Sequence, residues 1–184
     1  VCQLLETAGA TNLILSELHN PAITNSFRPN NPDHLYLTQK LWPIFQNIPN
    51  LTVMSTDAGG AKMARYYAEQ LKAERVTSDK IRGGHNVVTE IRIIGNVNGK
   101  NILLVDDIAD TCGSLIATKN AAKKLGALDF YIAAVHAVLS GDGIKKIASD
   151  SDIKKTMVTN TIDKSNVQLP KKIRIIQVAD VFAK

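Results

Sequence analysis

The sequence contains an apolar run that leads directly into acidic, hydroxyl and glycine residues. Leu103-Leu104-Val105 is followed by Asp106-Asp107, and Asp110-Thr111-Cys112-Gly113-Ser114 comes shortly after. The apolar run predicts a buried strand, and the polar residues predict the start of a helix. The N–H groups and the positive dipole end of such a helix bind phosphate well, and the hydroxyls of Thr111 and Ser114 can assist them.

The carboxylates ahead of this predicted phosphate site would be repelled by the phosphate, so we expect them to face sugar hydroxyls or a metal ion. A phosphate and hydroxyls close together describe a phosphorylated pentose. The alternative is that the carboxylates only cap the helix, but three of them beside Gly113-Ser114 exceed what capping needs. The predicted sugar-phosphate site comprises Asp106, Asp107, Asp110, Thr111, Cys112, Gly113 and Ser114.

A second strand-to-helix junction lies at Ser55–Lys62. Its paired glycines allow backbone N–H groups to approach an anion closely, which predicts a binding loop for a di- or triphosphate. Asp57 could hold a Mg²⁺ ion that the phosphates also bind. The alternative for this segment is an ordinary turn. The predicted loop comprises Asp57, Ala58, Gly59, Gly60, Ala61 and Lys62.

Two further segments carry residues suited to this chemistry. His19 closes the first predicted strand, at the same rim as the two loops, whereas strand alternation would turn Glu17 to the other face. Lys80 and Arg82 lie two positions apart in an extended segment, so they would point the same way on a flap that closes over phosphates. The alternatives are a structural histidine and a solvated surface hairpin. His136 is interpreted as a core residue.

The elements that must position these residues alternate between strands and helices, which predicts an α/β fold with a mostly parallel sheet flanked by helices and one inserted β-hairpin. The chain is expected to form a single domain over residues 1–184. Asn98-Gly99 predicts a hairpin turn between two of the strands. The predicted strands are 12–18 (buried), 51–55, 90–97, 101–105, 130–139, 156–160 and 173–178, and the predicted helices are 35–45 (interrupted at Pro43), 61–73, 115–125 and 143–148.

The composition excludes several other classes of protein. Apolar residues make up 45% of the 184 residues, but no run reaches the roughly 18 residues that a membrane span needs. The net charge of +5 favours anionic ligands, yet the lysines are dispersed and aromatic residues are only 5%, so nucleic acid is not an expected partner. Two cysteines without metal-ligand spacing are expected in a reducing cytoplasm. The first residues, which lack an initiator methionine, predict a segment missing upstream.

The residues above resemble the ribose-phosphate pyrophosphokinase family, also called phosphoribosyl-pyrophosphate synthetases. VDDIADTCGS at 105–114 is similar to the family's ribose-5-phosphate signature on a type I phosphoribosyltransferase fold. Four further matches follow the family's order across most of the chain: SELH at 16–19, STDAGGAK at 55–62, DKIR at 79–82 and VTNTI at 158–162. The chain departs from the family at Glu17, where an aspartate is usual, and at Gly83-Gly84-His85, where a more basic stretch is usual.

The resemblance implies transfer of the diphosphoryl group of ATP to the C1 hydroxyl of ribose 5-phosphate, in a homo-oligomer that uses Mg²⁺. It implies that Lys80 and Arg82 are the catalytic pair, that His19 and Asp57 bind the metal, and that residues 57–62 hold the pyrophosphate. Two alternatives remain open: a non-catalytic subunit that binds sugar phosphate and regulates an active partner, and a phosphoribosyltransferase that consumes the activated sugar.

Overall fold

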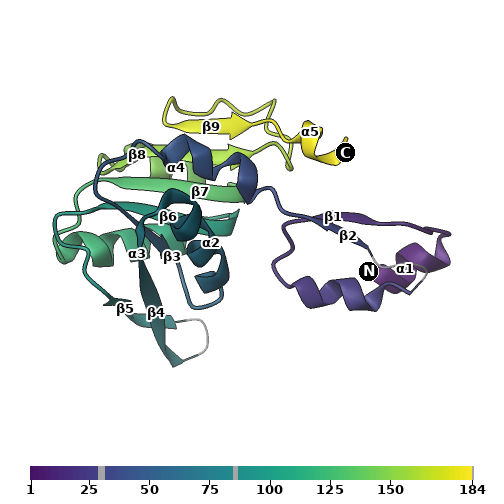
Figure 1. Cartoon of the computed structure of the whole chain (residues 1–184), viewed down its shortest axis with the longest axis horizontal. Helices are drawn as coiled ribbons and strands as arrows, with labels where there is room; N and C mark the ends of the chain where they lie inside the picture. The colour runs from purple at the N-terminus through teal and green to yellow at the C-terminus, as the bar shows by residue number, and fades with distance from the viewer. Residues whose placement is uncertain (29–31, 85–86, 184) are drawn as a thin grey trace.

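The computed structural model describes residues 1–28, 32–84 and 87–183, and the side chains of these residues apart from 81–84 and 87–89. Most of the described chain forms a seven-stranded sheet flanked by helices, and a smaller N-terminal group lies beside it (Figure 1). The strands are β1 (Ile14–Ser16), β2 (Asp33–Leu35), β3 (Leu51–Ser55), β4 (Glu74–Gly84), β5 (Val87–Ile94), β6 (Asn101–Ala109), β7 (Phe130–Ala137), β8 (Ile153–Thr159) and β9 (Ile173–Ile176). The α-helices are α1 (Cys2–Thr7), α2 (Ala61–Leu71), α3 (Gly113–Lys124), α4 (Gly143–Ser149) and α5 (Ala179–Phe182), and the 3₁₀ helices are η1 (Pro21–Ser26), η2 (Thr38–Lys40) and η3 (Trp42–Phe45).

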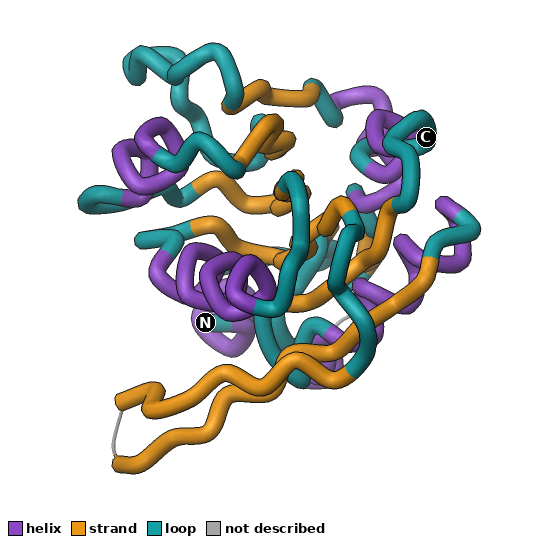
Figure 2. Tube along the Cα trace, turned by 90° about the vertical axis from the view of Figure 1, so that its left-hand side faces the viewer, coloured by secondary structure: helices purple, strands orange, loops and turns teal. Residues whose placement is uncertain are grey.

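The large sheet has the strand order β5-β4-β3-β6-β7-β8-β9, and all of its pairings are parallel except β4–β5. This arrangement is the predicted mostly parallel α/β sheet, and the β4–β5 pair is the inserted hairpin. Figure 2 shows this long hairpin projecting from the rest of the sheet. Parallel strands place their carboxyl ends at one edge, which is where ligands bind in such sheets.

Two apolar layers hold the helices against the sheet. On one face, Leu115 and Ala122 of α3 pack with Ile102 and Leu104 of β6. On the other face, α2 and the η2–η3 segment pack against alternate residues of the same strands, including Leu103. The central strands are therefore buried on both faces, as the apolar runs predicted.

Several predicted elements differ from the structure. The strand expected at 12–18 spans Ile14–Ser16 and is not buried. Ile14 is 56% exposed, because β1 pairs with the short β2 outside the large sheet. The helix expected at 35–45 consists of two 3₁₀ turns, the second with Pro43 in its first turn, where a missing N–H costs little.

The hairpin predicted across Asn98-Gly99 is wrong. β5 ends at Ile94 and pairs with β4, whereas β6 lies between β3 and β7. An Asn-Gly turn is a local signal, and it does not specify which strand lies beside which in the sheet. The strand after this turn is also longer than expected, because β6 continues from Asn101 through the acidic pair to Ala109.

Candidate sugar-phosphate site

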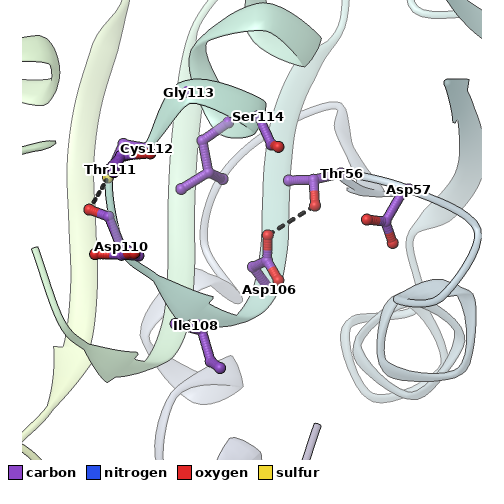
Figure 3. Close-up of a pocket in the computed structure, with 10 residues that line it drawn as sticks. Thr56, Asp57, Asp106, Ile108, Asp110, Thr111, Cys112, Gly113 and Ser114 are labelled. Atoms are coloured by element: carbon purple, nitrogen blue, oxygen red, sulfur yellow. Dashed lines mark hydrogen bonds between the residues drawn. The ribbon is translucent and has the colours of Figure 1, made fainter. Parts of the chain in front are cut away.

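The carboxyl end of β3 lies beside β6, with Ser55 opposite Val105, and β6 continues beyond this pair to Ala109. The residues that follow Ser55 and Val105 line a pocket of about 130 Å³ (Figure 3), several times the ~30 Å³ that one water molecule occupies in the liquid. All seven predicted sugar-phosphate residues except Asp107 line this pocket, as does Asp57 of the second loop. The lining residues are Thr56, Asp57, Asp106, Ile108, Asp110, Thr111, Cys112, Gly113, Ser114 and Leu115.

The first turn of α3 forms one wall of the pocket. Cys112 precedes this turn in a left-handed conformation (φ 57°), and its carbonyl accepts the N–H of Ile116 at 3.0 Å. Within the described residues, no side chain caps the start of α3. The N–H groups at Gly113, Ser114 and Leu115 belong to the part of a helix that lacks internal acceptors. An anion in this pocket would therefore meet N–H donors and a favourable helix dipole.

Asp106 faces this wall from β6. One carboxylate oxygen accepts the hydroxyl of Thr56 at 2.7 Å, and the other accepts the N–H of Asp107 at 3.0 Å. Burial raises the pKa of Asp106 to about 7, and the neighbouring carboxylates of Asp107 and Asp57 add to the effect. The pocket thus holds a carboxyl group that can both accept and donate hydrogen bonds near neutral pH.

Asp107 has a different partner from its neighbour. Its Oδ2 lies 2.6 Å from Nδ1 of His19, whose side chain is 79% exposed. This hydrogen bond and the charge of Asp107 raise the pKa of His19 above its ordinary value, and the charges of Asp106 and Asp57 add smaller effects. His19 was expected at the rim of the large sheet. It follows β1 of the separate two-stranded sheet instead, and it nevertheless reaches β6.

The predicted phosphate loop connects β3 to α2. Oδ1 of Asp57 accepts the N–H of Gly60 at 3.2 Å, and a Cβ added at Gly60 would lie 2.9 Å from that of Ser55, so this position needs glycine. Lys62 is exposed on the first turn of α2. Burial alone would raise the pKa of Asp57. The charge of Lys80 and the hydrogen bonds from Lys80 and the loop N–H groups together have the larger, opposite effect, so the pKa of Asp57 lies below its ordinary value.

The hairpin carries the predicted catalytic cations. Nζ of Lys80 donates to Oδ2 of Asp57 at 3.3 Å, and the Lys80 side chain is only 8% exposed. The structure therefore brings Lys80 to the phosphate loop. Arg82 lies in the same strand, but its side chain lies outside the described residues.

The predicted metal ligands have protein partners in this structure: His19 bonds to Asp107, and Asp57 bonds to Lys80. Among the residues whose side chains are described, no three His, Cys, Asp or Glu side chains form a ready-made metal site. Mg²⁺ in phosphate-transfer sites is commonly held by one or two carboxylates together with substrate phosphates and water. Asp57 lies in the predicted phosphate loop, and it is close enough to His19 for its charge to raise the pKa of that histidine. This arrangement fits a metal ion that binds together with a polyphosphate.

Residues that support the pocket from behind were not predicted. The Ser140 hydroxyl donates to Asp110, and Nζ of Lys146 donates to the carbonyl of Thr111 at 2.9 Å. A Cβ at Gly143 would lie 2.5 Å from the carbonyl of Asp110. The sequence Ser140-Gly141-Asp142-Gly143 reads as a turn, and nothing in it indicates which loop it packs against. Thr56 was also not predicted as a site residue, although it lies within the STDAGGAK segment at 55–62.

Cys112 is a structural part of the loop. Its side chain is buried, and burial raises the pKa of its thiol to about 11. The thiol is therefore neutral at physiological pH and a poor nucleophile. This agrees with a site that works by positioning and charge.

No helix in the described part of the chain is both long and apolar enough to cross a membrane.

The chain is similar to known proteins in sequence and in structure. The chain is 39% identical to a ribose-phosphate pyrophosphokinase from Chlorobaculum tepidum, an alignment that covers 99% of this chain and 56% of that protein. It is 41% identical to the Bacillus subtilis protein of the same name, over 86% of this chain and 50% of that one. The crystal structure of phosphoribosylpyrophosphate synthetase from Mycobacterium smegmatis superposes with a TM-score of 0.88 at 28% identity, covering 99% of this chain and 59% of that one.

The chain thus spans about half the length of the curated relatives that it matches. Residues 84–184 match the family model of the phosphoribosyl synthetase-associated domain, a stretch that contains β6, the pocket loop and the start of α3. The sheet, its ligand edge and these sequence matches agree, and the chain belongs to the phosphoribosyl synthetase-associated domain family.

Proposed function

We propose that this chain binds ribose 5-phosphate and takes part in a ribose-phosphate diphosphokinase reaction, in which ATP supplies the diphosphoryl group. The observation that carries the proposal is the pocket in which the uncapped start of α3 faces Asp106. A phosphate at Gly113 and Ser114 would meet N–H donors, and the Asp106 carboxyl would meet the sugar hydroxyls. A phosphorylated pentose carries both a phosphate and hydroxyl groups, so one ligand could meet both sides of the pocket.

The remaining loops suit the second substrate. The loop from Asp57 to Lys62 would hold the β- and γ-phosphates of ATP, and Lys80 would neutralise charge on them. Arg82 is proposed as the second cation of this pair. Mg²⁺, bound through Asp57 and His19 together with phosphate oxygens, would screen the charge on the transferred group. Phosphoryl-type transfer depends mainly on positioning and charge stabilisation, so no protein nucleophile is required.

The proposed reaction balances without a further reactant. The C1 hydroxyl oxygen of ribose 5-phosphate attacks the β-phosphorus of ATP. The bond from that phosphorus to the oxygen bridging to the α-phosphate breaks, AMP leaves, and the hydroxyl proton is released to solvent. The products are AMP and phosphoribosyl pyrophosphate, which nucleotide biosynthesis consumes.

Two measurements test the proposal on the 184-residue chain. Titration calorimetry with ribose 5-phosphate should show binding, whereas unphosphorylated ribose should bind far more weakly. Ser114→Ala should weaken binding, and Ser149→Ala, whose hydroxyl bonds within α4, serves as the matched control. Chromatography should then detect AMP when ATP, ribose 5-phosphate and Mg²⁺ are combined. Equal affinity for ribose and ribose 5-phosphate would contradict the phosphate site.

A second candidate follows from the coverage of the relatives. Because the chain spans about half of their length, it could bind sugar phosphate without turnover and serve a catalytic partner. Ribose 5-phosphate binding without AMP release would favour this regulatory function. A phosphoribosyltransferase would instead release pyrophosphate from phosphoribosyl pyrophosphate and a base, and the names of the relatives give this reading less support.

The assembly and location of the protein also belong to this proposal. Homo-oligomer formation follows from the family resemblance, and light scattering on the purified chain tests it. A cytoplasmic location is supported by the two cysteines, Cys2 and Cys112, which are both free and buried.

A further inference from the structure

His136 makes two hydrogen bonds at the carboxyl end of β7. Its Nε2 lies 3.1 Å from the carbonyl oxygen of Glu17, and its Nδ1 lies 2.9 Å from Oγ1 of Thr161. A carbonyl oxygen can only accept, so Nε2 carries a proton, and in the neutral imidazole Nδ1 then accepts the hydroxyl of Thr161. The imidazole therefore joins β7, the segment after β8, and a residue near the N-terminus of the chain.

The backbone at Glu17 is strained and held from several sides. Its φ is 41°, a left-handed conformation that costs a non-glycine residue free energy and persists only where contacts determine it. Its carboxylate accepts the N–H groups of Leu37 at 2.7 Å and Thr38 at 3.3 Å, and its own N–H donates to Leu35 at 2.9 Å. These partners all belong to β2 and the segment that directly follows it. The contact with His136 is different, because it ties Glu17 to the large sheet.

This tie lies directly beside the pair formed by His19 and Asp107. β6 and β7 are neighbours, and His136 is paired with Ile108, the residue after Asp107. Two bridges therefore run in parallel from adjacent strands to the same short segment: His136 to the carbonyl of Glu17, and Asp107 to the ring of His19. Because His19 is exposed, its position depends on the backbone that carries it.

We infer that His136 is a positioning residue that fixes the backbone at Glu17 and so holds His19 opposite Asp107. Its importance for catalysis rests on the proposed function, in which His19 contributes to binding the metal and phosphates. The placement of the segment itself does not depend on that function.

Amide hydrogen exchange on the 184-residue chain tests the placement without any substrate. The N–H groups of Glu17 and Leu18 are bonded to Leu35 and to Nε2 of His34. In His136→Ala both should exchange faster, on the order of tenfold, the equivalent of losing about one buried hydrogen bond. His136→Gln keeps a donor near Nε2 and should restore most of the protection.

The control is Ile132→Val, which trims a buried side chain of the same strand and leaves the Glu17 contact intact. It should leave exchange at Glu17 and Leu18 unchanged relative to the amides of β6. Unchanged exchange in His136→Ala, or equal acceleration across β6, would overturn the inference. If His136→Ala fails to fold, His136→Leu takes its place, because leucine fills much of the same space without a hydrogen-bond donor. Faster exchange at residues 17 and 18 in His136→Leu supports the inference, and wild-type exchange contradicts it.

Kinetics on a preparation with diphosphokinase activity tests whether His136 acts through His19. His136→Ala should lower kcat, and the double variant His19→Ala/His136→Ala should be no slower than His19→Ala alone. Additive losses would overturn the coupling to His19. If the wild-type chain shows no turnover while the exchange result holds, the proposed function fails and the positioning of the segment stands.

Discussion

Asp106→Asn should stabilise the protein, and the gain should grow with pH. The carboxyl group is largely buried, and its pKa rises from 3.8 to about 7 on folding. A raised pKa means that the proton stabilises the folded state fully below the unfolded pKa, and that this contribution is lost as pH rises through about 7. Three pH units at ~1.4 kcal/mol each amount to about 4 kcal/mol. Asparagine resembles the protonated acid and should escape this loss.

Urea unfolding at several pH values measures the effect. At pH 8 the variant should exceed the wild type by about 4 kcal/mol, and at pH 5 by roughly half of that or less, because most of the loss develops between pH 4 and 7. Asp142→Asn is the matched control, since this carboxylate is 67% exposed and lies at the start of α4. Its removal should change stability little at either pH.

The same variant should lose affinity for ribose 5-phosphate. Removing a hydrogen-bonding carboxylate from the pocket should weaken binding by about tenfold or more, and ATP binding should change much less. Higher stability together with lower affinity is the signature of a residue kept for function at a cost to folding. A variant whose stability gain is the same at pH 5 and pH 8, or absent at both, would contradict a buried Asp106 carboxyl with a pKa of about 7.

Other substitutions test the remaining parts of the site and its support. Lys80→Ala should lower kcat by a factor of ~10² or more in an active preparation, and an unchanged rate would exclude Lys80 from the mechanism. Gly60→Ala should destabilise the fold by about 1–3 kcal/mol, because its methyl group would crowd Ser55, and wild-type stability would contradict this packing. Lys119→Met should destabilise by about 3 kcal/mol in thermal unfolding at neutral pH, since it leaves Asp150 without the nearly buried cation 2.7 Å away. Unchanged stability in Lys119→Met would contradict this prediction and would mean that water solvates the Asp150 carboxylate in the variant.

The elements predicted best from sequence are those whose signal is local. The strand Leu51–Ser55 was predicted with its observed bounds. The predicted ends of β6, α2 and α3 lie within a few residues of the observed ones. Apolar runs and helical spacing determine these elements directly. The two loops of the site followed from the same signals, because they stand where a buried strand meets a helix.

The errors concern pairings between distant parts of the chain. Asn98-Gly99 predicted that the strands on either side of it pair, but the sheet places β4 beside β5 and inserts β6 elsewhere. β4 itself was not predicted as a strand, because Glu74–Gly84 carries several charged residues. Pairing is decided by packing and register across the sheet, which no short segment encodes.

The contact between His19 and Asp107 shows that two residues expected at the same rim can meet for a reason that the sequence did not indicate. His19 was placed near the acidic pair because its strand was assumed to lie in the main sheet, yet β1 belongs to the two-stranded sheet. What brings the histidine to β6 is the strained turn at Glu17 and its bond to His136. The sequence did not indicate a role in the site for either residue. Strand alternation predicted that Glu17 faces the opposite side from His19, and His136 was interpreted as a core residue. A histidine bonded through both ring nitrogens to distant segments is recognisable only once those segments are placed. Positioning residues of this kind are therefore the part of a site that sequence motifs leave out.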